Sequence, residues 1–386
     1  MANSFSFNSV SRINFGSGSS GDLVSISQGL GIDKPLIVTD PGIISCGLLE
    51  PVLASYSAAG VEPLLYADVV ADPPEQNIFD ALALAKEANC DGVIGFGGGS
   101  SMDVAKLLAI LLNTDQPLAE MYGVEMVRGQ RAPLIQVPTT SGTGSEATAV
   151  AIVTTGESTK AGVVSPVLFA DHIVLDPDLT LGLPPHVTAA TGIDAMVHAI
   201  EAFTSKRFKN PLSDMVAMKA LRLLSENIET AVNNGSDLEA RSNMLLGAML
   251  AGQAFANAPV GAVHALAYPL GGIYHIPHGL SNSLVLPHVI RFNAPAASHW
   301  YLEVAESLHG LDHQSLNAES VGDALADHFY QLAERLGLQT SLQQMEIADS
   351  ALEHLASQAM EQQRLLINNP REVAYEDALA IYQQAY

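Results

Sequence analysis

The stretch DGVIGFGGGSSMDVAKLLAILL, residues 91–112, decides the fold because it runs from an apolar strand through glycines into a helix. We expect the helix to begin near Ser100 or Ser101. Glycines let backbone amides approach a ligand closely, and a helix amino terminus offers unpaired N–H groups, so the segment suits a pyrophosphate. A tight turn capped by serine explains the same residues equally well. No G-K-[ST] follows, which excludes a Walker loop.

Similar strand patterns recur in the first half of the chain. They are KPLIVTD (34–40), APLIQVPTT (132–140) and HIVLDPD (172–178). The intervals 46–60 and 77–90 carry apolar residues at helical spacing. Repeating strand and helix units predict a mainly parallel sheet, which binds ligands beyond the carboxyl ends of its strands.

The character of the sequence changes after LGLPPHVTAATG, residues 181–192. From there the chain is rich in Ala, Leu, Met, Glu and Gln, which favour helices. Proline stops helices, so LPP at 183–185 is a natural joint. The sequence therefore predicts an α/β domain over 1–183 and an all-helical domain over 184–386.

Charge and cysteine content exclude several classes of function. Forty-one acidic and 17 basic residues give a formal charge of −24, which repels nucleic acid and anionic lipid. Cys46 and Cys90 form no C-x-x-C pair, so neither a disulfide framework nor a thiolate metal site is expected. The longest apolar run, LLAILL at 107–112, is too short to span a bilayer. We expect a cytoplasmic protein that binds neither nucleic acid nor membrane.

Two strand ends carry polar groups that suit a dinucleotide. Asp40 closes LIVTD, where a carboxylate can accept bonds from a ribose and repel a 2′-phosphate, favouring NAD over NADP. Taken alone, Asp40 is better explained as a turn residue before Pro41 and Gly42. PTTSGTGSEAT (138–148) follows another strand and is either a polar cofactor cradle or a solvated loop.

TGIDAMVHAIEAF, residues 191–203, indicates a metal site. On a helix, Asp194 and His198 lie one turn apart on the same face. Downstream, His264 and His278 complete a set of one carboxylate and three imidazoles, with His275 as a decoy. Such a set suits Fe(II) or Zn(II) rather than Mg(II) or Ca(II). A single histidine on a helix is more often structural, and the spacing to His264 is not diagnostic.

Four motifs in order resemble the iron-containing (group III) alcohol dehydrogenase family. They are GFGGGSSMDVAK, PTTSGTGSEAT, ATGIDAMVHAIEA and VHALAYPLGGIYHIPHG. The resemblance implies a dehydroquinate synthase-like architecture, with an α/β NAD-binding domain, an all-α metal-binding domain and a homodimer or larger assembly. It implies that Asp194, His198, His264 and His278 bind the metal. The implied NAD contacts are Asp40, Asp72, Gly97, Gly98, Gly99, Ser100, Asp103, Thr139, Thr140, Thr143, Ser145, Val153, Lys160 and Leu179.

The sequence departs from part of the family at one position. Some members place a histidine four residues after the third metal ligand, near the nicotinamide, whereas this chain has Tyr268. Tyrosine has an ordinary pKa near 10 and is a weaker proton-exchange group at neutral pH. Phe255 is a candidate for the substrate pocket, although core packing explains it equally well.

The resemblance implies an NAD-dependent oxidoreductase that interconverts an alcohol and an aldehyde or ketone, with the metal polarising the substrate oxygen. Reduction of an oxoacid such as maleylacetate is an alternative that needs a cationic anchor, such as Arg207 or Lys209. A dehydroquinate synthase-like lyase would need several basic residues, and this chain is poor in them. A non-catalytic metal or dinucleotide sensor is a further alternative.

Overall fold

The computed structural model describes residues 4–156 and 159–386, and the chain divides into two compact units. One unit is Asn8–Gly182. The other is Leu183–Tyr386 together with residues 4–7. The first is built around a parallel sheet and the second is helical, which confirms the predicted fold class.

The α/β unit contains a six-stranded parallel sheet in the order β1-β9-β6-β4-β2-β3. Its strands are β1 (Arg12–Phe15), β2 (Pro35–Val38), β3 (Leu64–Tyr66), β4 (Gly92–Gly97), β6 (Leu134–Pro138) and β9 (His172–Leu175). The four predicted strands are β2, β4, β6 and β9. All four are buried along their length, because a parallel sheet is covered on both faces.

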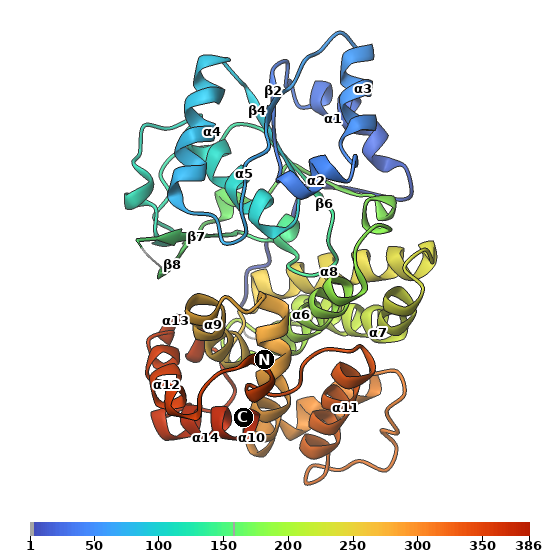
Figure 1. Cartoon of the computed structure of the whole chain (residues 1–386), viewed down its shortest axis with the longest axis vertical. Helices are drawn as coiled ribbons and strands as arrows, with labels where there is room; N and C mark the ends of the chain where they lie inside the picture. Colours follow the sequence, from blue (N-terminus) through green and yellow to red (C-terminus); the bar gives the residue numbers. More distant parts are fainter. Residues whose placement is uncertain (1–3, 157–158) are drawn as a thin grey trace. The chain divides into compact units, whose positions relative to one another are not determined.

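Helices cover both faces of this sheet. They are α1 (Leu23–Gly29), α2 (Pro41–Ser45), α3 (Glu50–Ala58), α4 (Glu75–Glu87) and α5 (Gly99–Leu111). Figure 1 shows β2 and β4 between α4 and α5 on one side and α1 and α3 on the other. The helix predicted from Ser100 or Ser101 is α5, which begins slightly earlier, at Gly99. Nearly all of α5 is buried, which explains its apolar sequence.

A second, three-stranded sheet was not predicted from the sequence. It has the order β5-β8-β7, with β5 (Gly123–Val124), β7 (Val150–Thr155) and β8 (Thr159–Val164). The strands β7 and β8 pair antiparallel, and β7 also bridges to the loop at Pro74. The residues 157 and 158 between them lie outside the described part of the chain.

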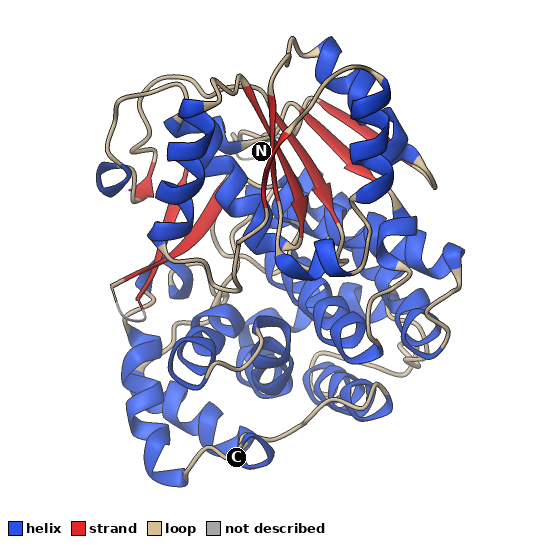
Figure 2. Cartoon of the chain, turned by 45° about the horizontal axis from the view of Figure 1, so that its top comes forward, coloured by secondary structure: helices blue, strands red, loops and turns tan. Residues whose placement is uncertain are grey.

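The second unit is helical over its described length (Figure 2). Its helices are α6 (Pro185–Phe203), α7 (Pro211–Asn233), α8 (Leu238–Asn257), α9 (Ala262–Tyr274), α10 (His278–Glu306), α11 (Val321–Arg335), α12 (Leu352–Met360), α13 (Gln363–Leu366) and α14 (Tyr375–Ala385). They enclose one continuous apolar core, and α6 is its central helix, since every residue from Gly192 to Phe203 is buried.

Among the described residues, no single helix is long and apolar enough to cross a membrane. Only α8 and α9 taken together meet that length and composition, and they are bent by 108° at the break between them.

Candidate metal centre

Two of the predicted ligands project from α6. Pro185 occupies the first position of this helix, where its fixed φ and missing N–H are compatible with helix initiation. Asp194 and His198 follow on one face and are 2% and 4% exposed. Buried polar groups of this kind need partners, and both side chains face residues from α9 and α10.

The other two histidines come from the first turns of α9 and α10. His264 is the third residue of α9, and His278 is the first residue of α10, directly after Pro277. The Nε2 atoms of His264 and His278 lie 3.9 and 3.6 Å from Oδ1 of Asp194. One donor atom from each of Asp194, His198, His264 and His278 lies within 4.8 Å of the others. The structure thus brings together the four residues that the resemblance implied.

The electrostatics of the cluster favour an ionised carboxylate. Burial raises the pKa of Asp194, but the electrostatic attraction of the nearby imidazoles of His198, His278 and His264 and the hydrogen bond from Asn282 outweigh this effect and lower the pKa below its ordinary value. A carboxylate surrounded by three imidazoles within this distance fits a divalent cation of intermediate softness, such as Fe(II) or Zn(II).

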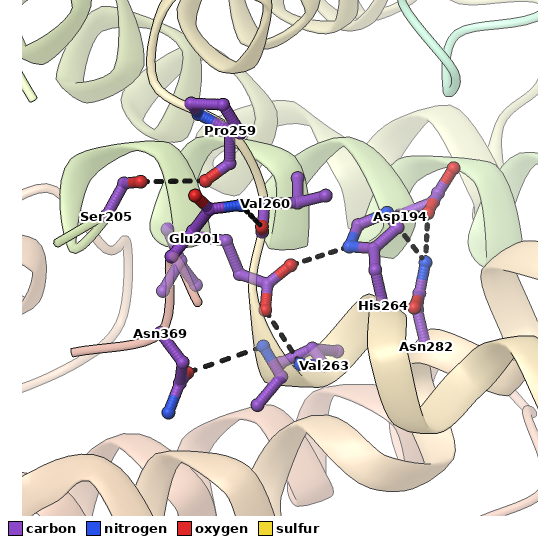
Figure 3. A network of polar contacts seen from close by, with 12 residues as sticks. Asp194, Glu201, Ser205, Pro259, Val260, Val263, His264, Asn282 and Asn369 are labelled. Carbon is purple, nitrogen blue, oxygen red and sulfur yellow. Dashed lines mark hydrogen bonds and ion pairs between the residues drawn. The ribbon is translucent and has the colours of Figure 1, made fainter. Parts of the chain in front are cut away.

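Two residues that the sequence analysis did not single out also belong to the cluster. Glu201 Oε2 accepts a 2.6 Å hydrogen bond from Nδ1 of His264. Asn282 Nδ2 donates to Oδ1 of Asp194 at 2.6 Å and lies 3.3 Å from Nε2 of both His264 and His278. Figure 3 shows these contacts around His264. A signal was present, since Glu201 follows Asp194 by seven residues on one helix and Asn282 follows His278 by four.

A glycine allows α10 to approach α6 closely. A Cβ atom at Gly279 would lie 2.3 Å from the carbonyl oxygen of Ala190 and 3.2 Å from Cβ of Asp194. The backbone of α10 therefore rests on α6 beside the first ligand. This contact sets the position of His278, the neighbour of Gly279, relative to Asp194.

Aromatic rings flank the cluster. Phe255 of α8 stacks on His198, with ring centroids 4.4 Å apart, and Tyr268 of α9 lies 6.1 Å from His278. The His278 side chain is 44% exposed, whereas the other three candidate ligands are buried. Solvent thus reaches the cluster beside His278. The decoy His275 is exposed, ends α9 in a left-handed conformation with φ 55° and is not part of the cluster.

In the α/β unit, predicted cofactor residues gather at the carboxyl ends of three adjacent strands. Asp40 follows β2, Gly98 and Gly99 follow β4, and Thr139 and Thr140 follow β6. The glycine turn packs closely on its neighbours. A Cβ at Gly97 would lie 3.2 Å from Oδ2 of Asp40, and one at Gly99 would lie 2.9 Å from Cγ2 of Thr143. A side chain at Gly97 would crowd Ser101 and one at Gly99 would crowd Thr143, so glycine allows this close packing.

Asp40 also caps a helix. Its Oδ1 accepts from the backbone N–H groups of Gly42 and Ile43 at 2.9 and 3.2 Å, so it is the N-cap of α2. Its Oδ2 accepts a 3.4 Å bond from Ser101. The turn role that the sequence suggested is therefore present, and it leaves the carboxylate beside the glycine turn.

Asp103 and Ser145 join a buried polar network. Ser145 Oγ donates to Oδ1 of Asp103 at 2.5 Å, and the N–H of Ile152 donates to Oδ2 at 2.9 Å. The fully buried Lys106 donates to Ser145 and Thr148 at 2.7 and 3.0 Å. Burial lowers the pKa of Lys106, and the nearby Asp103 opposes that shift. The network fixes the loop after β6 against α5.

The other predicted cofactor residues lie around the second sheet or in the core. Lys160 of β8 forms an ion pair with Asp72, and the hydroxyl of Thr154 donates to the carbonyl oxygen of Asp72. Val153 is buried in β7, and Leu179 is buried in the core that includes α1 and α3. Ser100 lies at the start of α5, one residue after Gly99.

The two basic residues considered as anchors for an oxoacid lie between α6 and α7. Lys209 donates to Asp214 at 2.6 Å and to the carbonyl oxygen of Phe203, and it lies 3.8 Å from the centre of the Phe203 ring. Arg207 lies over the ring of Phe208. Lys209 is thus held by groups of its own helical unit.

Comparison with known proteins matches both the α/β unit and the helical unit to one family. The family profile described as iron-containing alcohol dehydrogenase matches residues 10–177, and that of the carboxy-terminal region of the Fe-containing alcohol dehydrogenase family matches residues 188–386. Long-chain-alcohol dehydrogenase 1 of Geobacillus thermodenitrificans is 39% identical over 98% of this chain and 97% of its own.

Solved structures are similar over the whole length. A 1,3-propanediol oxidoreductase superposes with a TM-score of 0.96 at 33% identity, covering 100% of both chains. The sulfoacetaldehyde reductase of Bifidobacterium kashiwanohense, solved in complex with NAD⁺, superposes with a TM-score of 0.89 at 28% identity and covers 99% of both chains. With both halves matched, the chain belongs to the iron-containing alcohol dehydrogenase family.

Proposed function

We propose that the protein interconverts an alcohol and its aldehyde or ketone with NAD(H), using Fe(II) held by Asp194, His198, His264 and His278. The observation that carries this proposal is the convergence of one carboxylate and three imidazoles within 4.8 Å. A divalent metal bound there supplies Lewis-acid polarisation of the substrate oxygen. The family to which the chain belongs supports hydride transfer to a nicotinamide as the reaction.

The chain's own groups bind and orient the reactants. The glycine turn and the amino terminus of α5 offer N–H groups to the pyrophosphate. Asp40 accepts bonds from the ribose. Near the cluster, the rings of Phe255 and Tyr268 provide apolar surface for the carbon chain of the substrate and reduce the access of water. The exposed side of His278 is the route by which the substrate enters.

The ion pair of Lys209 favours an alcohol or aldehyde over an oxoacid as the substrate. Its ammonium group is bound to Asp214, and burial lowers its pKa. To hold a substrate carboxylate, Lys209 would have to give up that ion pair. The half-buried carboxylate of Asp214 would then lack its cationic partner.

A substrate panel tests the proposal. The protein is reconstituted with Fe(II) under anaerobic conditions and assayed with alcohols, diols, hydroxyacids and aldehydes, each with NAD(H) and NADP(H). We expect turnover of alcohols and aldehydes with NAD(H). Faster turnover of hydroxyacids or oxoacids would refute the proposed substrate class, and no turnover by fully metal-loaded protein would refute the activity.

Asp40 is expected to set the cofactor preference. Asp40→Asn removes the charge beside the 2′ position but keeps an oxygen to cap α2. We therefore expect the ratio of kcat/KM for NADP to that for NAD to rise by roughly tenfold, equivalent to about 1.4 kcal/mol. Asp40→Gly should relax the preference as well, with the additional loss of the cap. Equal use of both cofactors by the unmutated protein would disprove this role.

The ring of Tyr268 is expected to matter more than its hydroxyl. Tyr268→Phe keeps the ring next to His278, so we expect kcat to fall by much less than the roughly 100-fold that loss of a general acid or base produces. Tyr268→Ala should be worse, because it opens a cavity beside the cluster. Steady-state kinetics with metal content and NADH affinity measured in parallel provide the check. If Tyr268→Phe is as damaging as loss of a ligand while both stay normal, the hydroxyl is catalytic.

A cytoplasmic location and a homodimeric or larger assembly complete the proposal. Both Cys46 and Cys90 are free thiols, as expected in a reducing compartment. Light scattering of the purified protein measures the assembly.

A further inference from the structure

We infer that Glu201 is a positioning residue that fixes the tautomer and the orientation of His264 for metal binding. This inference rests on the proposed function, because it assigns a task to a residue that supports one of the proposed ligands. Glu201 does not itself reach the cluster. It acts through His264, whose Nδ1 it contacts at 2.6 Å (Figure 3).

The hydrogen bonds of Glu201 leave one arrangement of protons. Oε1 accepts from the backbone N–H of Val263 at 2.7 Å, and Oε2 contacts Nδ1 of His264 at 2.6 Å. A carboxylate has only acceptor atoms, so the proton of the second bond belongs to Nδ1. The amide NH₂ of Asn282, which can only donate, lies 3.3 Å from Nε2 of His264, so Nε2 is the acceptor and keeps its lone pair. This nitrogen is the one that faces Asp194 and Asn282.

The same carboxylate also stabilises the start of α9. The N–H groups at a helix amino terminus have no partner within the helix. In α9, that of Ala262 donates to Oδ1 of Asn369 and that of Val263 donates to Glu201. Because His264 is the next residue, Glu201 binds both the backbone of the first turn and the imidazole that projects from it. Glu201 thus fixes the His264 ring in two ways. It accepts the proton on Nδ1 of the ring, and it holds the first turn of α9, from which the ring projects.

Glutamine cannot replace both of these contacts. An amide of the same shape has one acceptor oxygen, whereas Glu201 accepts from two N–H donors. If the oxygen keeps the bond to Val263, the amide NH₂ faces Nδ1 of His264, which must then accept. The proton moves to Nε2 and blocks the lone pair that faces the cluster. Because glutamine has nearly the same volume as glutamate, this change needs no expansion of the core.

Two substitutions and one control test the role of Glu201. Glu201→Gln should alter the tautomer, and Glu201→Leu should remove both acceptors. Ser205→Ala is the matched control, because Ser205 is also buried near the end of α6 and donates to the carbonyl oxygen of Pro259 at 2.8 Å. It contacts none of the four proposed ligands in the bonds that the structure gives. Its loss should lower the unfolding free energy only slightly, as expected for one neutral hydrogen bond.

The first measurement needs no metal. Nitrogen-15 NMR of the metal-free protein, labelled at histidine and assigned with His264→Asn, should show the Nδ1–H form of His264 in the parent protein and in Ser205→Ala. In Glu201→Gln a large part of the signal should shift to the Nε2–H form. The second measurement is a Zn(II) titration, in which both Glu201 variants should bind about 10- to 100-fold more weakly than the parent, whereas Ser205→Ala should match it.

The outcomes separate this inference from the proposed function. An unchanged tautomer in Glu201→Gln, together with parent-like Zn(II) affinity in both Glu201 variants, would overturn it. If Ser205→Ala lost as much Zn(II) affinity as the Glu201 variants, the inference would also be overturned, because the effect of Glu201 would then be a general structural one. If the parent protein bound no Zn(II) or Fe(II) at all, the proposed function would fail, while the NMR comparison would still decide the tautomer.

Discussion

His264→Ala is expected to lose its metal and its turnover. The substitution removes a buried nitrogen from the cluster and leaves Glu201, which is 6% exposed, without the imidazole that it contacts. Losing a ligand should weaken metal binding by more than the roughly 10- to 100-fold that outer contacts contribute. Metal content after dialysis, measured by mass spectrometry, and turnover of the Fe(II)-reconstituted protein provide the check.

His275 supplies the control for this experiment. It is exposed and ends α9 at φ 55°, a conformation that asparagine tolerates better than alanine. His275→Asn should therefore retain metal and activity, and His275→Ala should retain most of its metal with some loss of stability. Metal loss in His275→Asn, with metal retained in His278→Ala, would show that the wrong histidine had been assigned.

Gly279→Ala is expected to unfold more easily and to bind metal weakly. The added Cβ would lie 2.3 Å from the carbonyl oxygen and 2.7 Å from the carbonyl carbon of Ala190, so α10 must move away from α6. Overpacking of this kind costs about 1 to 3 kcal/mol of unfolding free energy. The shift carries His278 and Asn282 away from Asp194. Urea unfolding of the metal-free protein and a Zn(II) titration measure the two effects separately.

Gly271→Ala is the matched control. Gly271 lies inside α9, and a Cβ there would be 3.5 Å from the carbonyl oxygen of Ile276, an ordinary contact. Alanine is also the better helix former, so this variant should be as stable as the parent or more so. If Gly279→Ala unfolds at the same urea concentration as Gly271→Ala, the close approach of α10 and α6 does not constrain the site.

The central strands of the α/β unit could be predicted because burial on both faces leaves a continuous apolar run. β2, β4, β6 and β9 have this pattern. β1 is largely exposed and β3 has only three residues, so neither leaves such a run. β7 alternates between buried and half-buried residues along much of its length after a loop rich in Ser, Thr and Gly. For this reason β7 was not predicted from the sequence.

For the candidate site, the proposed metal ligands could be predicted, but the residues that hydrogen-bond to these ligands could not. The pairing of Asp194 with His198 follows from helical spacing alone. No spacing in the sequence separates His278 from His275, and it was the family resemblance that supported treating His275 as the decoy. The physical basis of this choice is local, because His275 ends one helix and His278 begins the next. Helical spacing places Glu201 on the face of Asp194 and Asn282 on the face of His278, but their roles depend on where α9 and α10 meet α6, which no local pattern specifies.

The dispersal of the four proposed ligands over α6, α9 and α10 has a consequence for the chain as a polymer. An ion bound to His198, His264 and His278 closes two loops of the chain, a long one between residues 198 and 264 and a short one between residues 264 and 278. Closing such loops is entropically unfavourable in an unfolded chain, and the fully assembled set of donors exists only when the three helices have met. Metal uptake therefore favours the folded ensemble by mass action, by about 2.7 kcal/mol when free metal is 100 times its Kd. In a cell short of iron, the helical unit would open more often, and proteases would then remove the idle enzyme faster than the loaded one.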